Sequence, residues 1–383
     1  MAYKKFSAAQ LFDGYRMMGN DQVLITTEDG TVEAIVPRAD AGTDIREFDG
    51  ILSPGFVNCH CHLELSHLKG HIPEGTGLIE FVYYVIRNRH FGEQEILAAI
   101  NTGESEMLRN GIVAVGDICN NTLTAPQKSK NRLRYHNFIE VSGFVNAIAE
   151  ERFQRAQGML EQFAVQHSTN SIVPHAPYSV SEALWEKIVH YPGNDLLTIH
   201  NQETIPENEL FLEKNGGFLS FYEKMNIDIS WFTASGKTSL QTFLPKFLAT
   251  QQLLLVHNVF TSKEDIAFSK AGSYPALYWC LCPNANLYIT GQLPDINMLI
   301  EEDCPIVLGT DSLASNHQLS IISEMKSILQ HYPSITLSQL FSWGTLNGAK
   351  ALKMDQELGS FEKGKRPGVV LSKGDLSGSE RLL

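Results

Sequence analysis

The sequence predicts a (β/α)8 barrel joined to a small β-domain that both chain ends build. Eight short apolar runs alternate with amphipathic stretches of helical length between residues 53 and 352. This alternation is typical of βα units, and eight of them favour a closed barrel over an open sheet. The flanking segments 1–52 and 353–383 are instead rich in turn residues and short strand-like runs. We expect these two segments to pair beside the barrel.

Length and composition suit this architecture. The chain has 383 residues, 43% of them hydrophobic, so a barrel of roughly 250 residues and an added piece both fit. The formal net charge is −13, whereas a nucleic-acid binder needs a basic face. No run approaches the roughly 20 apolar residues of a membrane-spanning helix, and residues 1–14 lack the apolar core of a signal peptide. We predict a cytoplasmic protein that binds a small-molecule substrate and neither nucleic acid nor membrane; a homo-oligomer is left open.

The cysteines predict a reduced protein without a structural zinc knuckle. None of the six belongs to a C-x-x-C pair, which such knuckles use. We therefore expect free thiols at Cys59, Cys61, Cys119, Cys280, Cys282 and Cys304.

Individual elements follow from the apolar periodicity. Residues 6–52 are expected to form short strands, with turns at Asp29-Gly30 and Asp49-Gly50. The eight barrel strands are predicted at 55–61, 113–118, 136–141, 171–174, 196–199, 253–256, 278–281 and 306–308. Helices are predicted between and after them, including 93–108, 150–163, 182–189, 319–331 and 337–352.

His60 and His62 stand at the end of the first predicted strand. Side chains alternate along a strand, so these two imidazoles share a face while Cys59 and Cys61 take the other. Two imidazoles at this spacing can chelate one cation, although two hydrogen-bonded histidines would satisfy the same pattern. The two thiols are predicted to be buried in the core because they point away from the imidazoles.

Other polar residues stand where later strands stop, namely His175, His200, His257 and Asp311. In a barrel these stops share one rim, where active sites are built. A lone histidine after a strand is more often structural than catalytic. However, four such positions fall at the same rim as the His-x-His pair, and this coincidence is better explained by one shared site than by four separate structural roles. The sequence therefore predicts a metal site on this rim.

The sequence resembles the amidohydrolase superfamily over nearly the whole chain. Segment 53–62 resembles its first-strand motif, 200–203 its His-x-x-Glu motif after the fifth strand, and 308–316 the eighth-strand motif of its aminohydrolase branch. Segment 174–179 is similar to a motif of purine-nucleoside deaminases, among them the aminodeoxyfutalosine and S-adenosylhomocysteine deaminases. The resemblance implies that the metal is bound by His60, His62, His200 and Asp311. It also implies that His257 contacts the metal-bound water.

The resemblance bears on the number of metal ions as well. Dinuclear members of the superfamily carry a bridging, carbamylated lysine after the fourth strand, where this chain has His175. We therefore expect one divalent cation, zinc with iron as the alternative, and an open position for water as in catalytic zinc sites. His175 is then expected to bind the substrate.

The predicted activity is hydrolytic deamination of an aminopurine nucleoside or derivative, aminodeoxyfutalosine- or adenosine-like. A divalent cation lowers the pKa of bound water from near 15.7 to about 7, so hydroxide can attack the amine-bearing carbon at neutral pH. Glu203 is expected to carry a proton from that water to the ring nitrogen, and Asp311 to carry one to the leaving amine. His257 is expected to orient the hydroxide, and ammonia leaves.

Some alternatives stay open at this point. The metal ligands do not separate a deaminase of nucleosides from an amidohydrolase-fold hydrolase acting on guanine, cytosine or a cyclic amide. A metal-binding protein without catalysis is disfavoured by Glu203, because a binding site needs no general base. Arg87 and Arg89 are expected either to face an acidic substituent of the substrate or to lie on a solvated helix face. Segment 282–286 carries asparagine where serine is common in the family, which bears on substrate fit.

Overall fold

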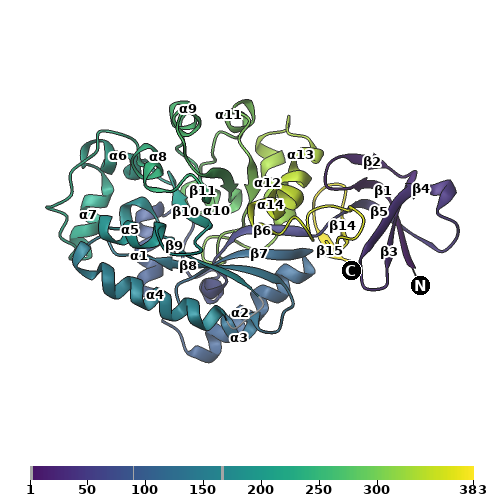
Figure 1. The fold of residues 1–383 in the computed structure, drawn as a ribbon, viewed down its shortest axis with the longest axis horizontal. Coiled ribbons are helices and arrows are strands. Elements are labelled where there is room, and N and C mark those ends of the chain that lie inside the picture. Colours follow the sequence, from purple (N-terminus) through teal and green to yellow (C-terminus); the bar gives the residue numbers. More distant parts are fainter. Residues whose placement is uncertain (1–2, 89, 165–167) are drawn as a thin grey trace.

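The computed structural model describes residues 3–88, 90–164 and 168–383. Figure 1 shows a barrel with a β-sheet domain at one end. Two four-stranded parallel sheets make the barrel wall, and each strand coincides with a predicted one. These strands are β6 (Phe56–Cys61), β7 (Ile112–Cys119), β8 (Arg134–Val141), β9 (Thr169–Pro174), β10 (Leu196–Asn201), β11 (Gln252–His257), β12 (Ala276–Leu281) and β13 (Ile306–Leu308). The predicted (β/α)8 fold class is confirmed.

Backbone hydrogen bonds close the barrel at the two seams between these sheets. At one seam the amide of His200 donates to the carbonyl of His175 over 3.0 Å, which joins β9 to β10. At the other, the amides of Thr310 and Asp311 both donate to the carbonyl of His60, each over 3.0 Å, which joins the end of β13 to β6. Both seams therefore run through residues of the predicted site.

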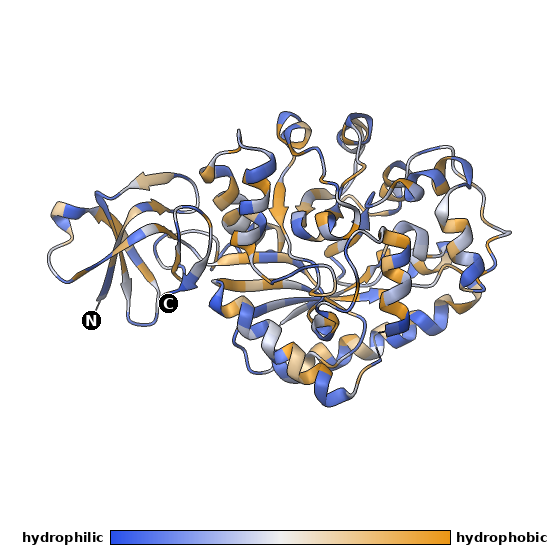
Figure 2. Ribbon diagram, turned by 180° about the vertical axis from the view of Figure 1, so that it is seen from behind, coloured by the Kyte–Doolittle hydropathy of each residue, from blue (hydrophilic) through white to orange (hydrophobic). Residues whose placement is uncertain are grey.

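Several barrel strands, such as β7 and β11, are nearly continuous apolar runs because both of their faces are buried. All eight residues of β7 are buried, and β11 contributes four fully buried residues from Leu253 to Val256. In Figure 2 the strands are largely orange, while the surrounding helices carry both orange and blue residues. The helices thus cover the strands with apolar side chains and present polar ones to solvent.

Helices follow the strands as the periodicity predicts. The predictions at 93–108, 150–163, 182–189 and 319–331 correspond, within two residues, to α2 (Glu93–Arg109), α4 (Ala149–Ala164), α5 (Glu182–Val189) and α12 (Ile321–His331). The stretch 337–352 is helical but contains a π turn, Trp343–Asn347, between α13 (Leu337–Ser342) and α14 (Gly348–Ala351). Further helices are α1 (Leu78–Asn88), α3 (Ala125–Lys128), α6 (Ile205–Glu213), α7 (Gly217–Lys224), α8 (Ser239–Phe243), α9 (Lys263–Ala271), α10 (Pro283–Thr290) and α11 (Ile296–Glu301).

The state of the cysteines and the character of the helices are also seen in these elements. The six cysteines are free thiols, and all but Cys304 are buried. Among the helices of the described residues, none combines the length and the apolar character that crossing a membrane would require.

The β-domain contains strands from both chain ends, as predicted. Its seven-stranded sheet has the order β15-β14-β5-β1-β3-β4, and β2 pairs with β1. The strands are β1 (Tyr3–Phe12), β2 (Met17–Gly19), β3 (Gln22–Thr27), β4 (Val32–Pro37), β5 (Ile45–Ser53), β14 (Val370–Ser372) and β15 (Ser379–Arg381). Because β14 pairs antiparallel with β5, the C-terminal segment is tied directly to the strand that leads into the barrel. The boundaries 1–52, 53–352 and 353–383 stay a prediction.

The two predicted turns of the β-domain have different outcomes. Asp29-Gly30 lies between β3 and β4 and forms a turn, as expected. The turn predicted at Asp49-Gly50 is wrong, because both residues lie inside β5. The register of β5 against β1 shifts between Phe48 and Ile51, so the pair forms a β-bulge there. Gly50 has φ 120°, in the left-handed region that favours glycine.

Replacing Gly50 tests how tightly β14 is packed on this bulge. A Cβ at position 50 would lie 2.3 Å from the carbonyl oxygen of Ser372, whereas a Cβ at Gly30, which also has positive φ, would meet nothing within 4 Å. Gly30→Ala should cost about 1–2 kcal/mol in free energy of unfolding, from backbone strain alone. Gly50→Ala should cost about 1–3 kcal/mol more, because β14 must move. Denaturant melts of both variants measure the difference, and equal losses would contradict this packing.

Candidate active site

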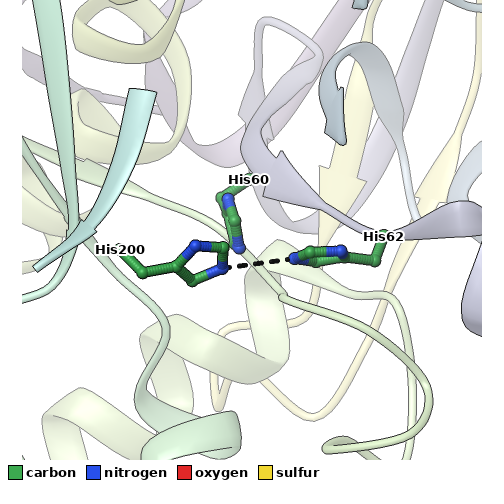
Figure 3. A group of neighbouring side chains, drawn as sticks. All are labelled: His60, His62 and His200. Carbon is green, nitrogen blue, oxygen red and sulfur yellow. Dashed lines mark hydrogen bonds between the residues drawn. The ribbon is translucent and has the colours of Figure 1, made fainter. Parts of the chain in front are cut away.

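Three histidines gather at the carboxyl ends of the barrel strands. His60 lies in β6, His62 directly follows it, and His200 lies in β10; each has a ring nitrogen within 4.8 Å of the others. Figure 3 shows the three rings close together, with a dashed line joining His62 and His200, whose Nε2 atoms are 3.4 Å apart. Oδ1 of Asp311 lies 3.5 Å from Nε2 of both His60 and His62. The four residues predicted to bind metal are thus brought together.

Several buried nitrogen atoms in this group have no hydrogen-bond partner among the described residues. They are both ring nitrogens of His60 and Nδ1 of His62. An unsatisfied buried polar atom costs about 1–3 kcal/mol, and a bound ion is one common partner for such atoms. Burial lowers the pKa of His62 well below its usual value and that of His200 to about 4, so both rings are neutral at pH 7. Neutral imidazoles beside a carboxylate fit a divalent cation such as zinc.

Asp311 is held in place from several sides. Burial by itself would raise the pKa of this carboxyl, but His60, His62 and His257 outweigh it and keep the pKa well below its usual range. The hydroxyl of Ser315 donates to Oδ2 over 2.5 Å. The backbone of Asp311 has φ 55°, an unfavourable value that persists only where the surroundings enforce it. Asp311 is therefore an ionised carboxylate with a defined orientation.

Glu203 and His257 lie next to this group. Oε1 of Glu203 is 3.5 Å from Nε2 of His257. Burial raises the pKa of Glu203 well above its usual value, and the charges of Asp311 and Glu207 add to the effect. Nδ2 of Asn286 donates to Nδ1 of His257 over 3.0 Å, so the other ring nitrogen carries the proton. Asn286, in the segment expected to bear on substrate fit, lies behind His257 and not among the residues that line the cavity.

His175 connects the fourth and fifth barrel strands. Its carbonyl accepts a hydrogen bond of 2.7 Å from Nδ1 of His200, and its ring centroid lies 4.7 Å from that of His200. Nδ1 of His175 is hydrogen-bonded to the hydroxyl of Ser179 over 2.8 Å. Burial lowers the pKa of the His175 ring to about 4. Its Nε2 is thus the neutral ring nitrogen left for a further contact.

A cavity of about 170 Å³ opens over these residues. One part of its lining is apolar and comes from α1, where Leu78, Phe81, Val82 and Val85 repeat at the spacing of a single helix face. The predicted residues in the lining are His62, His175, His200, Glu203, His257 and Asp311. The structure therefore places the predicted chemistry and an apolar surface around one small space.

Several polar residues of the lining are absent from the sequence-based prediction, among them Glu64, Asn120 and Glu140. Oε2 of Glu64 accepts the backbone amides of Asn120 and Asn121 over 2.9 and 3.1 Å, and Nδ2 of Asn120 donates to Oε1 of Glu140 over 2.9 Å. The sequence did carry a signal that could have identified Glu140. This residue stands near the end of a barrel strand, as His200 and His257 do.

The predicted arginines do not face this cavity. Arg87 is exposed, its guanidinium lies over the ring of Tyr83, and it donates to the Tyr83 hydroxyl over 2.9 Å. Arg89 lies outside the described residues. No lysine or arginine of the described residues is among those that line the cavity. Arg87 therefore occupies the solvated helix face that was its alternative placement.

A buried ion pair anchors the chain just after His62. Nζ of Lys128 lies 2.5 Å from Oδ2 of Asp117, and both side chains are buried. The other carboxylate oxygen of Asp117 accepts the amide of Leu63 over 2.9 Å. Lys128 also donates to Oδ1 of Asn137 over 2.7 Å. The pair thus positions the backbone that carries His62.

The chain belongs to the amidohydrolase family, which it matches over residues 51–380. The adenosine deaminase of Helicobacter pylori is 26% identical over 324 residues, which cover 83% of this chain and 78% of the relative. The aminodeoxyfutalosine deaminase of Nitratiruptor sp. is 26% identical over 317 residues, 79% of this chain and 74% of that one. The predicted resemblance is confirmed, and the chain is a hydrolytic enzyme of this family.

Solved structures share the fold. The Helicobacter pylori aminofutalosine deaminase in complex with methylthio-coformycin has a TM-score of 0.83 at 20% identity, covering 99% of this chain and 97% of that one. An adenosine deaminase from Xanthomonas campestris with bound zinc has a TM-score of 0.75 at 21% identity, covering 97% and 84% of the two chains.

Lys128→Met tests the anchoring ion pair. It leaves the Asp117 carboxylate buried without its charge partner, so the free energy of unfolding should fall by about 3–5 kcal/mol. Zinc affinity, measured by competition with a chelator, should fall as well because the backbone after His62 loosens. Lys224→Met is the matched control. It breaks the exposed pair with Glu80 and should cost less than about 1 kcal/mol. Equal losses in the two variants would contradict the anchoring role.

Proposed function

We propose that this chain is a metal-dependent deaminase that releases ammonia from an aminopurine nucleoside or derivative by hydrolysis. The observation that carries the proposal is the grouping, around one cavity, of the buried carboxyl of Glu203 with a cluster of histidines and the ionised Asp311. The names of its relatives support the substrate class, since they are deaminases of adenosine, methylthioadenosine or S-adenosylhomocysteine, and aminodeoxyfutalosine.

We infer that one divalent cation, zinc with iron as the alternative, is held by His60, His62, His200 and Asp311. When bound, the cation supplies a Lewis acid that makes water a nucleophile at neutral pH. The unsatisfied nitrogen atoms of His60 and His62 support this assignment, as does the zinc of the Xanthomonas campestris relative. A single cation is supported by His175, which stands where dinuclear relatives carry a bridging lysine.

Two carboxylates would move the protons of the reaction. Water adds through its oxygen to the ring carbon that bears the amine, and Glu203 carries one proton of this water to the adjacent ring nitrogen. The raised pKa of Glu203 suits a group that takes up a proton and passes it on during the reaction. Asp311 passes the second proton to the amine. Ammonia then leaves, and the ring carbon becomes a carbonyl.

Two histidines would orient the reactants. His257 lies within 3.5 Å of Glu203, so its Nε2 is suited to hold the attacking water in line with that carboxylate. His175 would hydrogen-bond the substrate through Nε2, because Nδ1 is occupied by Ser179. Such positioning lowers the barrier by aligning the reacting atoms before the chemical step.

The second candidate is another hydrolase on the same scaffold, acting on guanine, cytosine or a cyclic amide. The small size of the cavity favours the free bases, guanine and cytosine, because a free base is smaller than a nucleoside. Its volume of about 170 Å³ is below the roughly 300–1,000 Å³ of most small-molecule sites.

Ammonia release across a substrate panel tests the proposed function. The zinc-loaded enzyme is offered adenosine, 5′-deoxyadenosine, aminodeoxyfutalosine, S-adenosylhomocysteine, guanine and cytosine. We expect the fastest release from a 6-aminopurine nucleoside, together with the absorbance shift of adenine to hypoxanthine. Rapid turnover of guanine or cytosine with inert nucleosides would instead support the second candidate.

Glu203→Gln tests the proton carrier. Glutamine has a similar shape but cannot accept the proton, so kcat should fall by about 10²–10⁴-fold while KM changes little. Metal analysis should give one equivalent of zinc in both the wild type and the variant. Glu186→Gln, at an exposed residue of α5, is the control and should retain full activity. Wild-type turnover by Glu203→Gln would exclude the proposed role, and two metal equivalents would exclude the single cation.

A further inference from the structure

Glu140 is a buried carboxylate with a free oxygen. It lies near the end of β8, and only 8% of it is exposed. Oε1 accepts a hydrogen bond of 2.9 Å from Nδ2 of Asn120. Oε2 has no hydrogen-bond partner among the described residues. Since an unsatisfied buried carboxylate oxygen is costly, a donor from outside the chain is the natural partner.

Neighbouring groups of the chain do not use this oxygen. Nδ1 of His200 is 3.8 Å from Oε2, but that nitrogen is bonded to the carbonyl of His175 over 2.7 Å. A carbonyl only accepts, so Nδ1 carries the proton and donates it there. For the same reason His200 cannot bind a second cation through Nδ1, although Glu140, His175 and His200 lie close together. Glu140 therefore neither fixes His200 nor completes a second metal site.

The surroundings of Glu140 are polar on both sides. Glu140, Asn120 and Ser142 line the cavity over the metal-binding group, and they also line an adjoining polar hollow of about 80 Å³, whose lining includes Arg152 and Arg155. The apolar part of the cavity lining comes from α1 instead. A substrate ring beside Glu203 would therefore meet Glu140 with its polar substituent. Of the groups on a nucleoside, the sugar hydroxyls are the donors that such a substituent offers.

We infer that Glu140 is a specificity residue whose free carboxylate oxygen accepts a hydrogen bond from a sugar hydroxyl of the substrate. This inference rests on the proposed deamination of a nucleoside. A buried acceptor left without a donor is costly, so the contact discriminates between ribose and deoxyribose.

The wild-type enzyme provides the first test. Rates of ammonia release are compared for adenosine, 2′-deoxyadenosine and 3′-deoxyadenosine with the zinc-loaded protein. Loss of the contacted hydroxyl should lower kcat/KM by about 10- to 100-fold for at least one deoxy analogue. Equal kcat/KM values for all three nucleosides would overturn the inference without any variant. Inactivity on every aminopurine nucleoside would overturn the proposed function together with the inference.

Glu140→Gln and Glu140→Ala test whether Glu140 is the source of the preference for ribose over deoxyribose. Both should lower kcat/KM for adenosine toward the value for the sensitive deoxy analogue, whose own rate stays near that of the wild type. Zinc content should remain at one equivalent, which a general disturbance of the site would not preserve. Glu161→Gln, at an exposed residue of α4, is the matched control and should keep the ribose preference. An unchanged preference in Glu140→Gln would overturn the inference while the proposed function stands, and if the variants do not fold, the wild-type comparison decides.

Discussion

One backbone carbonyl, that of His60, links the architecture of this protein to its site. It accepts the amides of both Thr310 and Asp311, which closes the barrel between its last and first strands. The same closure brings the carboxylate of Asp311 against the rings of His60 and His62. Gly309 makes this approach possible, because a Cβ there would lie 2.8 Å from Cβ of His60. Barrel closure and site geometry therefore depend on the same few atoms.

Burial then sets the charge state of several groups at this seam. It lowers the pKa of His62 and His200, and the carboxyl of Glu203 retains its proton more readily than in solution. Asp311 is the exception, since the surrounding histidines outweigh its burial. Left-handed backbone at His257 and Asp311 marks the strand ends where these side chains turn. Such strain persists only in a rigid frame, which the barrel supplies.

The cavity above the seam has two chemically different parts. The face of α1 offers aliphatic and aromatic side chains, whereas Glu64, Asn120 and Glu140 form a connected polar group. A heterocycle with a polar substituent suits this division, because its flat ring can use the apolar part while its donors reach the carboxylates. Among the described residues that line this cavity there is no lysine or arginine, whereas Arg152 and Arg155 line the adjoining hollow together with Glu140.

The sequence by itself determined the eight-stranded barrel and most of the residues that meet in the site. Apolar runs of strand length ending in His60, His200, His257 and Asp311 are local signals, because the position of a polar residue after a strand is visible in one segment. The Asp49-Gly50 turn was mispredicted for a related reason. The same dipeptide suits a turn or a bulge, and only the pairing of β5 with β1 decides between them.

The tertiary structure alone decided which polar atoms are left without partners. Glu140 looks like any strand-end carboxylate in the sequence, and its free oxygen follows from two distant contacts. Asn120 occupies one of its oxygens, while His175 takes the proton of His200 that could have reached the other. Arg87, about two and a half turns along α1 from the cavity-lining Leu78, lies on the opposite side of its helix, and the packing of α1 with Leu78 toward the cavity therefore directs Arg87 to solvent. Hydrogen-bond competition and helix orientation depend on segments far apart in the chain, so no local pattern records them.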